Sequence, residues 1–85
     1  MKKYFEGSAG DFAGESEKAI CLTRCDSAFG FHDRRMWIPK SICIIGEPNE
    51  YGWRKLAIPV WFLRKNGIWD LPFREINGGT KMVEY

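Results

Sequence analysis

The stretch RRMWIPKSICII, residues 34–45, decides which fold this chain can adopt. Large and β-branched residues dominate it, which is typical of a strand. Pro39 interrupts the pattern, and proline in a sheet is confined to edges, first positions and bulges because it has no N–H to donate. We therefore predict a bend at Pro39, with Trp37 packed inward, Lys40 outward and residues 42–45 entering the core.

The segments on either side predict further short strands joined by turns. KAICLTRC, residues 18–25, is rich in β-branched and apolar residues and is expected to pair with residues 34–45 across a hairpin loop at 26–33. Gly, Pro and Asn favour a turn at 46–52, before another strand in WRKLAI. Further elements are expected near the ends of the chain: strand character in KKYF and DFA, a turn at 14–18, a Gly-Gly turn at 78–79 and a short edge strand after it.

PVWFLRKNG, residues 59–67, carries the signals of a short helix over 59–66. Pro59 suits the first helical position, where its missing N–H costs nothing. The Asn-Gly pair that follows can adopt the left-handed conformation at a helix end, and two basic residues lie near the negative end of the helix dipole. The helical period places Pro59, Phe62, Leu63 and Asn66 on one face and Trp61, Arg64 and Lys65 on the other.

These elements predict a mainly β (α+β) fold in a single domain over residues 1–85. The architecture expected is a small curled antiparallel sheet or a five-stranded OB-like or SH3-like barrel, with one short helix near 59–66. Closing a barrel would remove the exposed strand edges. Aromatic residues form 15% of the chain, which helps so small a core because each ring buries a large area at low rotamer cost.

The sequence also indicates where the protein works. No apolar run approaches the roughly 20 residues that span a bilayer. The start, MKKYFEGSAGDF, lacks the apolar region of a secretory signal, and three cysteines do not make an even disulfide framework. We therefore expect a reduced, cytoplasmic protein with no membrane partner.

Cys21, Cys25, His32 and Cys43 have the ligand count of a structural zinc site, but their spacing argues against one. Three residues separate Cys21 from Cys25, which on a strand places them roughly 13 Å apart along its axis. Zinc knuckles usually have two residues between paired cysteines. We predict no metal and no cofactor, and interpret Cys21 and Cys43 as small hydrophobic residues in adjacent core strands.

Catalysis is not expected either. His32 beside Asp33 could act as a base with its orienting group, and Cys25 as a nucleophile, but all three fall in or beside a loop, where such a pair is usually solvated. The sequence has no glycine-rich phosphate motif and no paired-carboxylate pattern. A chain this small also rarely builds a water-excluding pocket. We predict a non-catalytic binding protein.

Cations adjoin tryptophans at three places in the chain. Single-stranded nucleic acid is bound by this pairing, because cations follow phosphates and rings stack on bases at about 1–3 kcal/mol each. The alternative is that the indoles form the core and the cations its solvated rim. Interspersed acidic residues such as Glu47 and Glu50 weaken any uniform positive face. The candidate binding residues are Arg34, Arg35, Lys40, Trp53, Arg54, Lys55, Trp61, Arg64 and Lys65.

Three segments within residues 14–67, ESEKAICL, MWIPKS and LAIPVWFLRKNG, resemble a pattern in small uncharacterised proteins of bacteriophages and prophages. In these, a strand beginning E-(S/T)-(D/E)-K-A precedes a W-(I/L)-P-K-S strand, and a third strand runs into a short Pro-initiated helix containing Trp. Such proteins usually carry aliphatic residues where Cys21 and Cys43 stand, which agrees with core positions. The resemblance implies a phage or mobile-element setting in the host cytoplasm and no particular activity.

Two hypotheses for function follow. In the first, the protein binds single-stranded DNA or RNA. In the second, it is a small inhibitor of a host defence protein, similar to an anti-CRISPR, and uses Trp and Arg as interface hot spots. The mixed charges favour a protein partner, whereas the adjacency of cations and aromatic rings favours nucleic acid.

Overall fold

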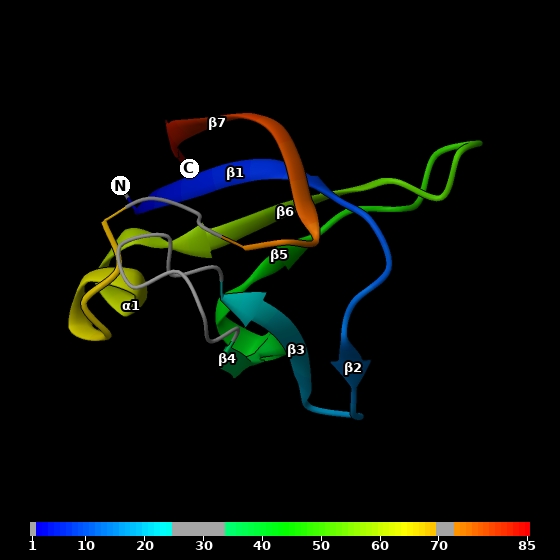
Figure 1. Cartoon of the computed structure of the whole chain (residues 1–85). Helices are drawn as coiled ribbons and strands as arrows, with labels where there is room; N and C mark the ends of the chain where they lie inside the picture. The colour runs from blue at the N-terminus through cyan, green and yellow to red at the C-terminus, as the bar shows by residue number, and fades with distance from the viewer. Residues whose placement is uncertain (1, 25–33, 70–72) are drawn as a thin grey trace.

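The computed structural model describes residues 2–24, 34–69 and 73–85, which form two antiparallel sheets, a short α-helix and a 3-10 turn (Figure 1). The larger sheet has four strands in the order β5-β6-β1-β7, and the smaller has three in the order β2-β3-β4. The strands of the larger sheet are β1 Lys3–Ala9, β5 Ile44–Ile45, β6 Arg54–Pro59 and β7 Ile76–Glu84. Those of the smaller sheet are β2 Gly14–Glu15, β3 Ala19–Arg24 and β4 Arg34–Pro39.

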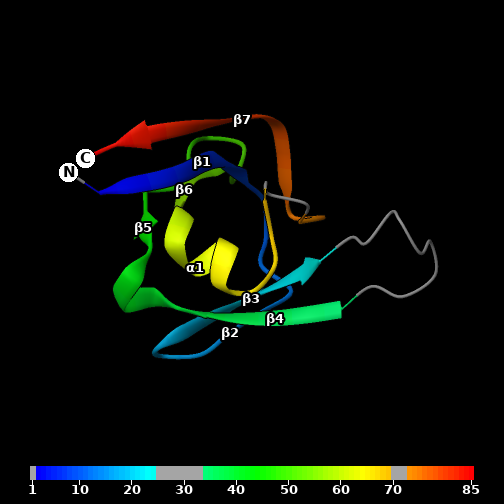
Figure 2. The same cartoon turned by 90° about the vertical axis from the view of Figure 1, so that its left-hand side faces the viewer.

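The core lies between the two sheets, and helix α1 (Val60–Lys65) lies between them as well (Figure 2). Alternate residues of the strands point into it, such as Leu22 of β3 and Leu56 of β6, and Leu63 reaches it from the helix. All three are 0% exposed. Burying a side chain of this size contributes about 1.5–3 kcal/mol, so the alternation along these strands is what holds the sheets together.

Residues 73–75 join the two sheets at one edge. The N–H of Thr23 on β3 donates to both carboxylate oxygens of Glu75, at 3.0 and 2.8 Å, and the N–H of Arg74 donates to the Thr23 carbonyl at 2.9 Å. The N–H of Gly10 donates to the Glu75 carbonyl at 2.8 Å. The two-residue β2 is too short to pair with this part of β3, and these bonds take its place.

The strands remain in two sheets and do not close into a ring. The prediction of a mainly β fold with a small curled antiparallel sheet and one short helix is therefore confirmed, and the alternative of a closed five-stranded barrel is not. Strand β5, at one edge of the larger sheet, has only two residues and is too short to close the sheet into a barrel.

Trp37 faces away from the core, so the prediction that it packs inward is wrong. It is 54% exposed, whereas its neighbour Ile38 is 0% exposed and belongs to the core cluster. Trp37 lies opposite Cys21 across the β3–β4 pair, and a Cβ on Gly14 would meet Cys21 Cβ at 3.3 Å and Trp37 Cη2 at 3.4 Å. The indole therefore lies across the outer face of the smaller sheet, beside Cys21.

The bend predicted at Pro39 is present, and of the residues expected to enter the core, Ile42, Cys43 and Ile45 pack against its edge while only partly buried. Pro39 ends β4, the edge strand of its sheet, and residues Lys40–Ile42 form the 3-10 turn η1. β5 follows at the edge of the other sheet, and Ile44 is 37% exposed. None of residues 42–45 is fully buried, because a short edge strand is covered on only part of its surface.

Some of the remaining predictions of strands and turns are confirmed, and others are wrong. β3 and β6 confirm the strands expected in 18–25 and 53–58, and Asn49 Oδ1 accepts from Tyr51 N–H and Trp53 N–H in the expected turn at 46–52. DFA forms no strand. Of the turn predicted at 14–18, Gly14–Glu15 form β2 and only residues 16–18 reverse the chain, with the Ser16 N–H donating to the Ala19 carbonyl at 2.8 Å. Residues 78–79 lie inside β7. β7 pairs with β1 across a register shift, so the glycines lie in an irregular stretch of strand and not in a reversal. The loop predicted at 26–33 lies outside the described residues.

Candidate functional site

The structure places the three predicted cation–aromatic groups in three separate regions. The first lies on β4, the second at the start of β6 and the third on α1. Figure 1 shows α1 and the loop 46–53 at opposite ends of β6. The groups therefore do not combine into one continuous surface, and each has to be judged by its own geometry.

On β4, Arg34 and Arg35 are exposed and point to opposite faces of the smaller sheet, because neighbouring strand residues alternate. Arg35 shares the outer face with Trp37, two residues along. Arg34 lies directly opposite Arg24 of β3, which places two like charges side by side. This region offers one cation beside one exposed indole.

The Lys40 side chain forms an ion pair. Its Nζ lies 2.6 Å from Oε2 of Glu15, so the pair links η1 to β2. The hydrogen bond and charge of Lys40 lower the pKa of the Glu15 carboxyl. Because the salt bridge already holds the ammonium, Lys40 is less suited to bind a phosphate than an unpaired lysine.

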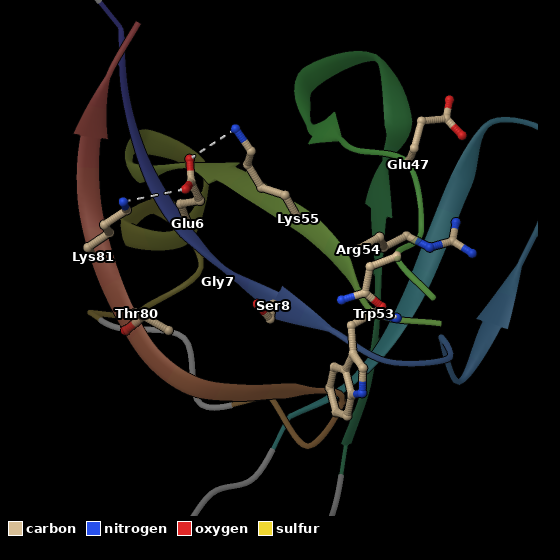
Figure 3. A pocket seen from close by; sticks show the side chains of 10 residues that line it. Glu6, Gly7, Ser8, Glu47, Trp53, Arg54, Lys55, Thr80 and Lys81 are labelled. Carbon is tan, nitrogen blue, oxygen red and sulfur yellow. Dashed lines mark hydrogen bonds and ion pairs between the residues drawn. The ribbon is translucent and has the colours of Figure 1, made fainter. Parts of the chain in front are cut away.

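At the start of β6, Arg54 and Lys55 point in opposite directions. The Arg54 guanidinium lies 5.0 Å from the centre of the Phe12 ring, and Figure 3 shows it directed away from Glu6 and Lys55. Arg54 Nε is buried and has no hydrogen-bond partner among the described residues. Arg54 therefore packs as part of the structure, while Lys55 lies on the open face of the larger sheet.

That open face contains a hollow of about 640 Å³ between β7 and the loop 46–53 (Figure 3). Trp53, half-buried, stands at one end, and Ser8 of β1 lies on the floor. Lys55 and Lys81 both approach the Glu6 carboxylate, at 3.9 Å each. No local sequence pattern indicates Glu6, Ser8 or Lys81, because strand register alone brings them beside Lys55.

The third cation–aromatic group, on α1, has the most exposed aromatic side chains. Trp61 is 58% exposed, and Trp69, just past the helix, is 71% exposed. The Arg64 guanidinium lies 5.2 Å from the centre of the Trp69 ring, a cation–π distance. Lys65 is exposed on the same helix. We call Trp61, Arg64, Lys65 and Trp69 the helix patch.

Local sequence explains why these four side chains face outward. The Gly67 N–H donates to the Arg64 carbonyl at 3.0 Å and the Ile68 N–H to the Leu63 carbonyl at 2.8 Å, which is the Schellman pattern for ending a helix. Gly67 has the positive φ, +74°, that this pattern requires. The motif buries Ile68 against the core beside Leu63. The next residue, Trp69, therefore emerges at the surface near Arg64.

The sequence predicted Trp61, Arg64 and Lys65 on one face of the helix and left open whether the indole is buried. The structure places all three side chains at the surface. The prediction missed Trp69, which lies beyond the predicted helix. The Asn-Gly-Ile run could have revealed it, since a Schellman ending turns the residue after the buried Ile68 outward. Between Val60 and Trp69 the chain contains no acidic residue, so the charge of this segment is uniformly positive.

The cysteines give no sign of a metal centre in the described part of the chain, where no three ligating side chains cluster. Cys21 is 1% exposed, so its predicted place as a small buried hydrophobic residue on a core strand is confirmed, although it is not a member of the main core cluster. Cys43 is partly buried against the core, and burial raises the pKa of its thiol to about 11. Cys25 and His32, the other members of the predicted set, lie outside the described residues.

Comparisons with protein families, with curated proteins and with solved structures returned no match. Within the described residues, no helix is both long and apolar enough to cross a bilayer.

Proposed function

We propose that this chain is a non-catalytic, phage-encoded protein that binds single-stranded nucleic acid through the helix patch. The observation that carries the proposal is the stacking of Arg64 on Trp69 beside a second exposed indole, Trp61. Exposed rings are available to stack on bases whatever the base sequence, and the adjoining cations can follow the phosphates.

The patch sets the expected strength of binding. Each base stacked on an indole contributes about 1–3 kcal/mol, and two indoles are present. Two cations, Arg64 and Lys65, predict a log–log salt slope of about −1.4 on a single strand, at about −0.7 for each phosphate contact. Binding through this patch alone should therefore be modest in affinity, with little preference for base sequence.

A second candidate function is inhibition of a host defence protein by direct binding. The observation that favours it is the separation of the three cation–aromatic groups, because a long strand would find no continuous track between them. A compact patch of two Trp and one Arg has the composition of a protein–protein hot spot. The same residues would then carry a protein interface.

Titration of a fluorescently labelled single-stranded oligonucleotide against salt tests the first function. We expect saturable binding that weakens as salt rises and that falls strongly in the Trp61→Ala/Trp69→Ala double variant. Lys18→Gln is the matched control for overall charge, because Lys18 is exposed on the turn between β2 and β3. No binding at about 50 mM salt would exclude the function, since electrostatic binding is strongest at low salt.

Capture from host lysate on immobilised protein tests the second. The wild-type chain should retain one partner in stoichiometric amount, and the Trp61→Ala/Trp69→Ala variant should lose it. A partner retained equally by both proteins would mean that the helix patch is not the interface. No retained partner would count against inhibition by direct binding.

A further inference from the structure

The hollow on the larger sheet has an unusual charge arrangement that the helix patch does not share. Lys55 of β6 and Lys81 of β7 approach one carboxylate, that of Glu6 on the strand between them, at 3.9 Å each. The Tyr85 hydroxyl also donates to Glu6 Oε2. The Glu6 side chain is 14% exposed, while those of Lys55 and Lys81 are 50% and 72% exposed.

Glu6 is thus an anion held by two ammonium groups and a hydroxyl, within an open concavity. Both nitrogen–oxygen distances lie at the outer limit of an ion pair, and at least half of each lysine side chain is exposed, so each pair is weak, while Lys55 Nζ also donates to the Tyr85 hydroxyl at 3.4 Å. A phosphate that entered the hollow could bind the same two ammonium groups. Glu6 would then act as a built-in competitor, because it already neutralises the charge that a phosphate needs.

The rest of the hollow suits a flat aromatic group. The Trp53 indole stands at its end and packs over Gly10, where an added Cβ would lie 3.4 Å from Trp53 Cζ3. Hydroxyls of Ser8 and Thr80 lie along the floor and one wall (Figure 3). Figure 3 shows the other acidic residue of the lining, Glu47, on the opposite wall from Lys81. A volume of about 640 Å³ is within the range of small-molecule sites.

We propose that this hollow binds a nucleoside phosphate, with the base against Trp53 and the phosphate between Lys55 and Lys81, and that Glu6 occupies the phosphate position until the ligand enters. The nucleoside phosphate is either free or part of a strand, since the chemistry is the same. The proposal does not rest on the helix patch, which lies at the other end of β6.

The test follows the indole N–H signals by NMR during titration with adenosine 5′-monophosphate, with adenosine and inorganic phosphate as separate probes. The Trp53 signal, identified by its absence from Trp53→Phe, should shift with the nucleotide. Lys81→Gln should weaken binding roughly threefold to tenfold, as loss of a charge-assisted contact does. Glu6→Gln should strengthen binding by a similar factor, while Lys18→Gln should change nothing.

Glu6→Gln and Lys81→Gln should change the affinity for the nucleotide in opposite directions, which distinguishes a ligand site from a structural ion pair. If Glu6 merely positions the lysines, Glu6→Gln will weaken binding as Lys81→Gln does, and the proposal is wrong. Absence of any Trp53 shift at about 10 mM nucleotide, in both the wild type and Glu6→Gln, would also overturn a free-nucleotide site.

A second experiment tests whether the ligand is a nucleotide within a nucleic-acid strand. It uses a short oligonucleotide with the Trp61→Ala/Trp69→Ala variant, in which the helix patch is disabled. A Trp53 shift that requires the oligonucleotide, and that Lys81→Gln reduces, would assign the hollow to a nucleotide within a strand. No shift in this experiment as well as the first would leave the hollow without a nucleoside phosphate ligand, whatever the helix patch binds.

Discussion

Trp37 lies directly opposite Cys21 across the β3–β4 pair, on the face of the smaller sheet that points away from the core. Cys21 is 1% exposed although Trp37 itself is 54% exposed. The thiol is therefore buried on a face where its cross-strand neighbour is itself open to solvent, and Gly14 of β2 lies close to both side chains.

Removing the indole should expose that thiol. We expect Trp37→Ala, in a Cys25→Ser background, to make Cys21 react rapidly with a thiol reagent such as DTNB in the folded protein. Trp61→Ala is the control, because Trp61 lies on the helix and leaves Cys21 covered. Unchanged protection of Cys21 in Trp37→Ala would show that another group shields it.

Ile38, the next residue along β4, should contribute more to stability than Trp37. Ile38 is fully buried in the core cluster, so Ile38→Ala should lower the free energy of unfolding by about 2–5 kcal/mol. Trp37→Ala should cost less, because roughly half of the indole is already in water. Urea denaturation of both variants measures the two losses. A greater loss for Trp37→Ala than for Ile38→Ala would mean that β4 faces the other way.

The link between the sheets depends on Glu75. Its carboxylate accepts the Thr23 N–H, so Glu75→Ala should leave that backbone donor without its partner and cost about 1–3 kcal/mol of unfolding free energy. Glu84→Ala, at an exposed position of β7, is the matched control and should change little. Equal urea midpoints for the two variants would show that water replaces the carboxylate at no cost.

The helix patch should show which of its cations contacts phosphate. Arg64→Gln and Lys65→Gln should each reduce the magnitude of the log–log salt slope of oligonucleotide binding by about 0.7 if each residue contacts one phosphate. Arg64→Gln should also weaken binding at every salt concentration, because the guanidinium no longer stacks on Trp69. Slopes that match the wild type in both variants would place the phosphate contacts elsewhere.

Cys43 should make stability depend on alkaline pH. Burial raises the pKa of its thiol from 9.0 to about 11, so between these values the unfolded chain has lost a proton that the folded chain keeps. The contribution to stability is therefore complete below pH 9.0 and disappears as the pH rises through about 11. We expect the free energy of unfolding to fall more steeply across this window in the wild type than in Cys43→Val. Parallel pH profiles would mean that the thiol titrates alike in both states.

Short-range signals in the sequence were enough to predict the helix and the residues that share each of its faces. Pro59 before α1 and the Asn66-Gly67 pair after it act within one turn of the backbone, so no distant contact is needed to interpret them. The turn at 46–52 and the strands β3 and β6 were predictable for the same reason. Each depends on residues adjacent in the chain.

The sequence by itself therefore determined the mainly β class, the helix and the shared helix face of Trp61, Arg64 and Lys65, while the tertiary structure decided that this face is exposed. The tertiary structure decided which face of β4 is covered, because alternation shows that Trp37 and Ile38 point apart but not which of them meets the core. It also decided the hollow, since Glu6 and Lys81 become neighbours only through the register of β1 with β7. That register depends on packing and on a strand irregularity, which act between residues far apart in the chain.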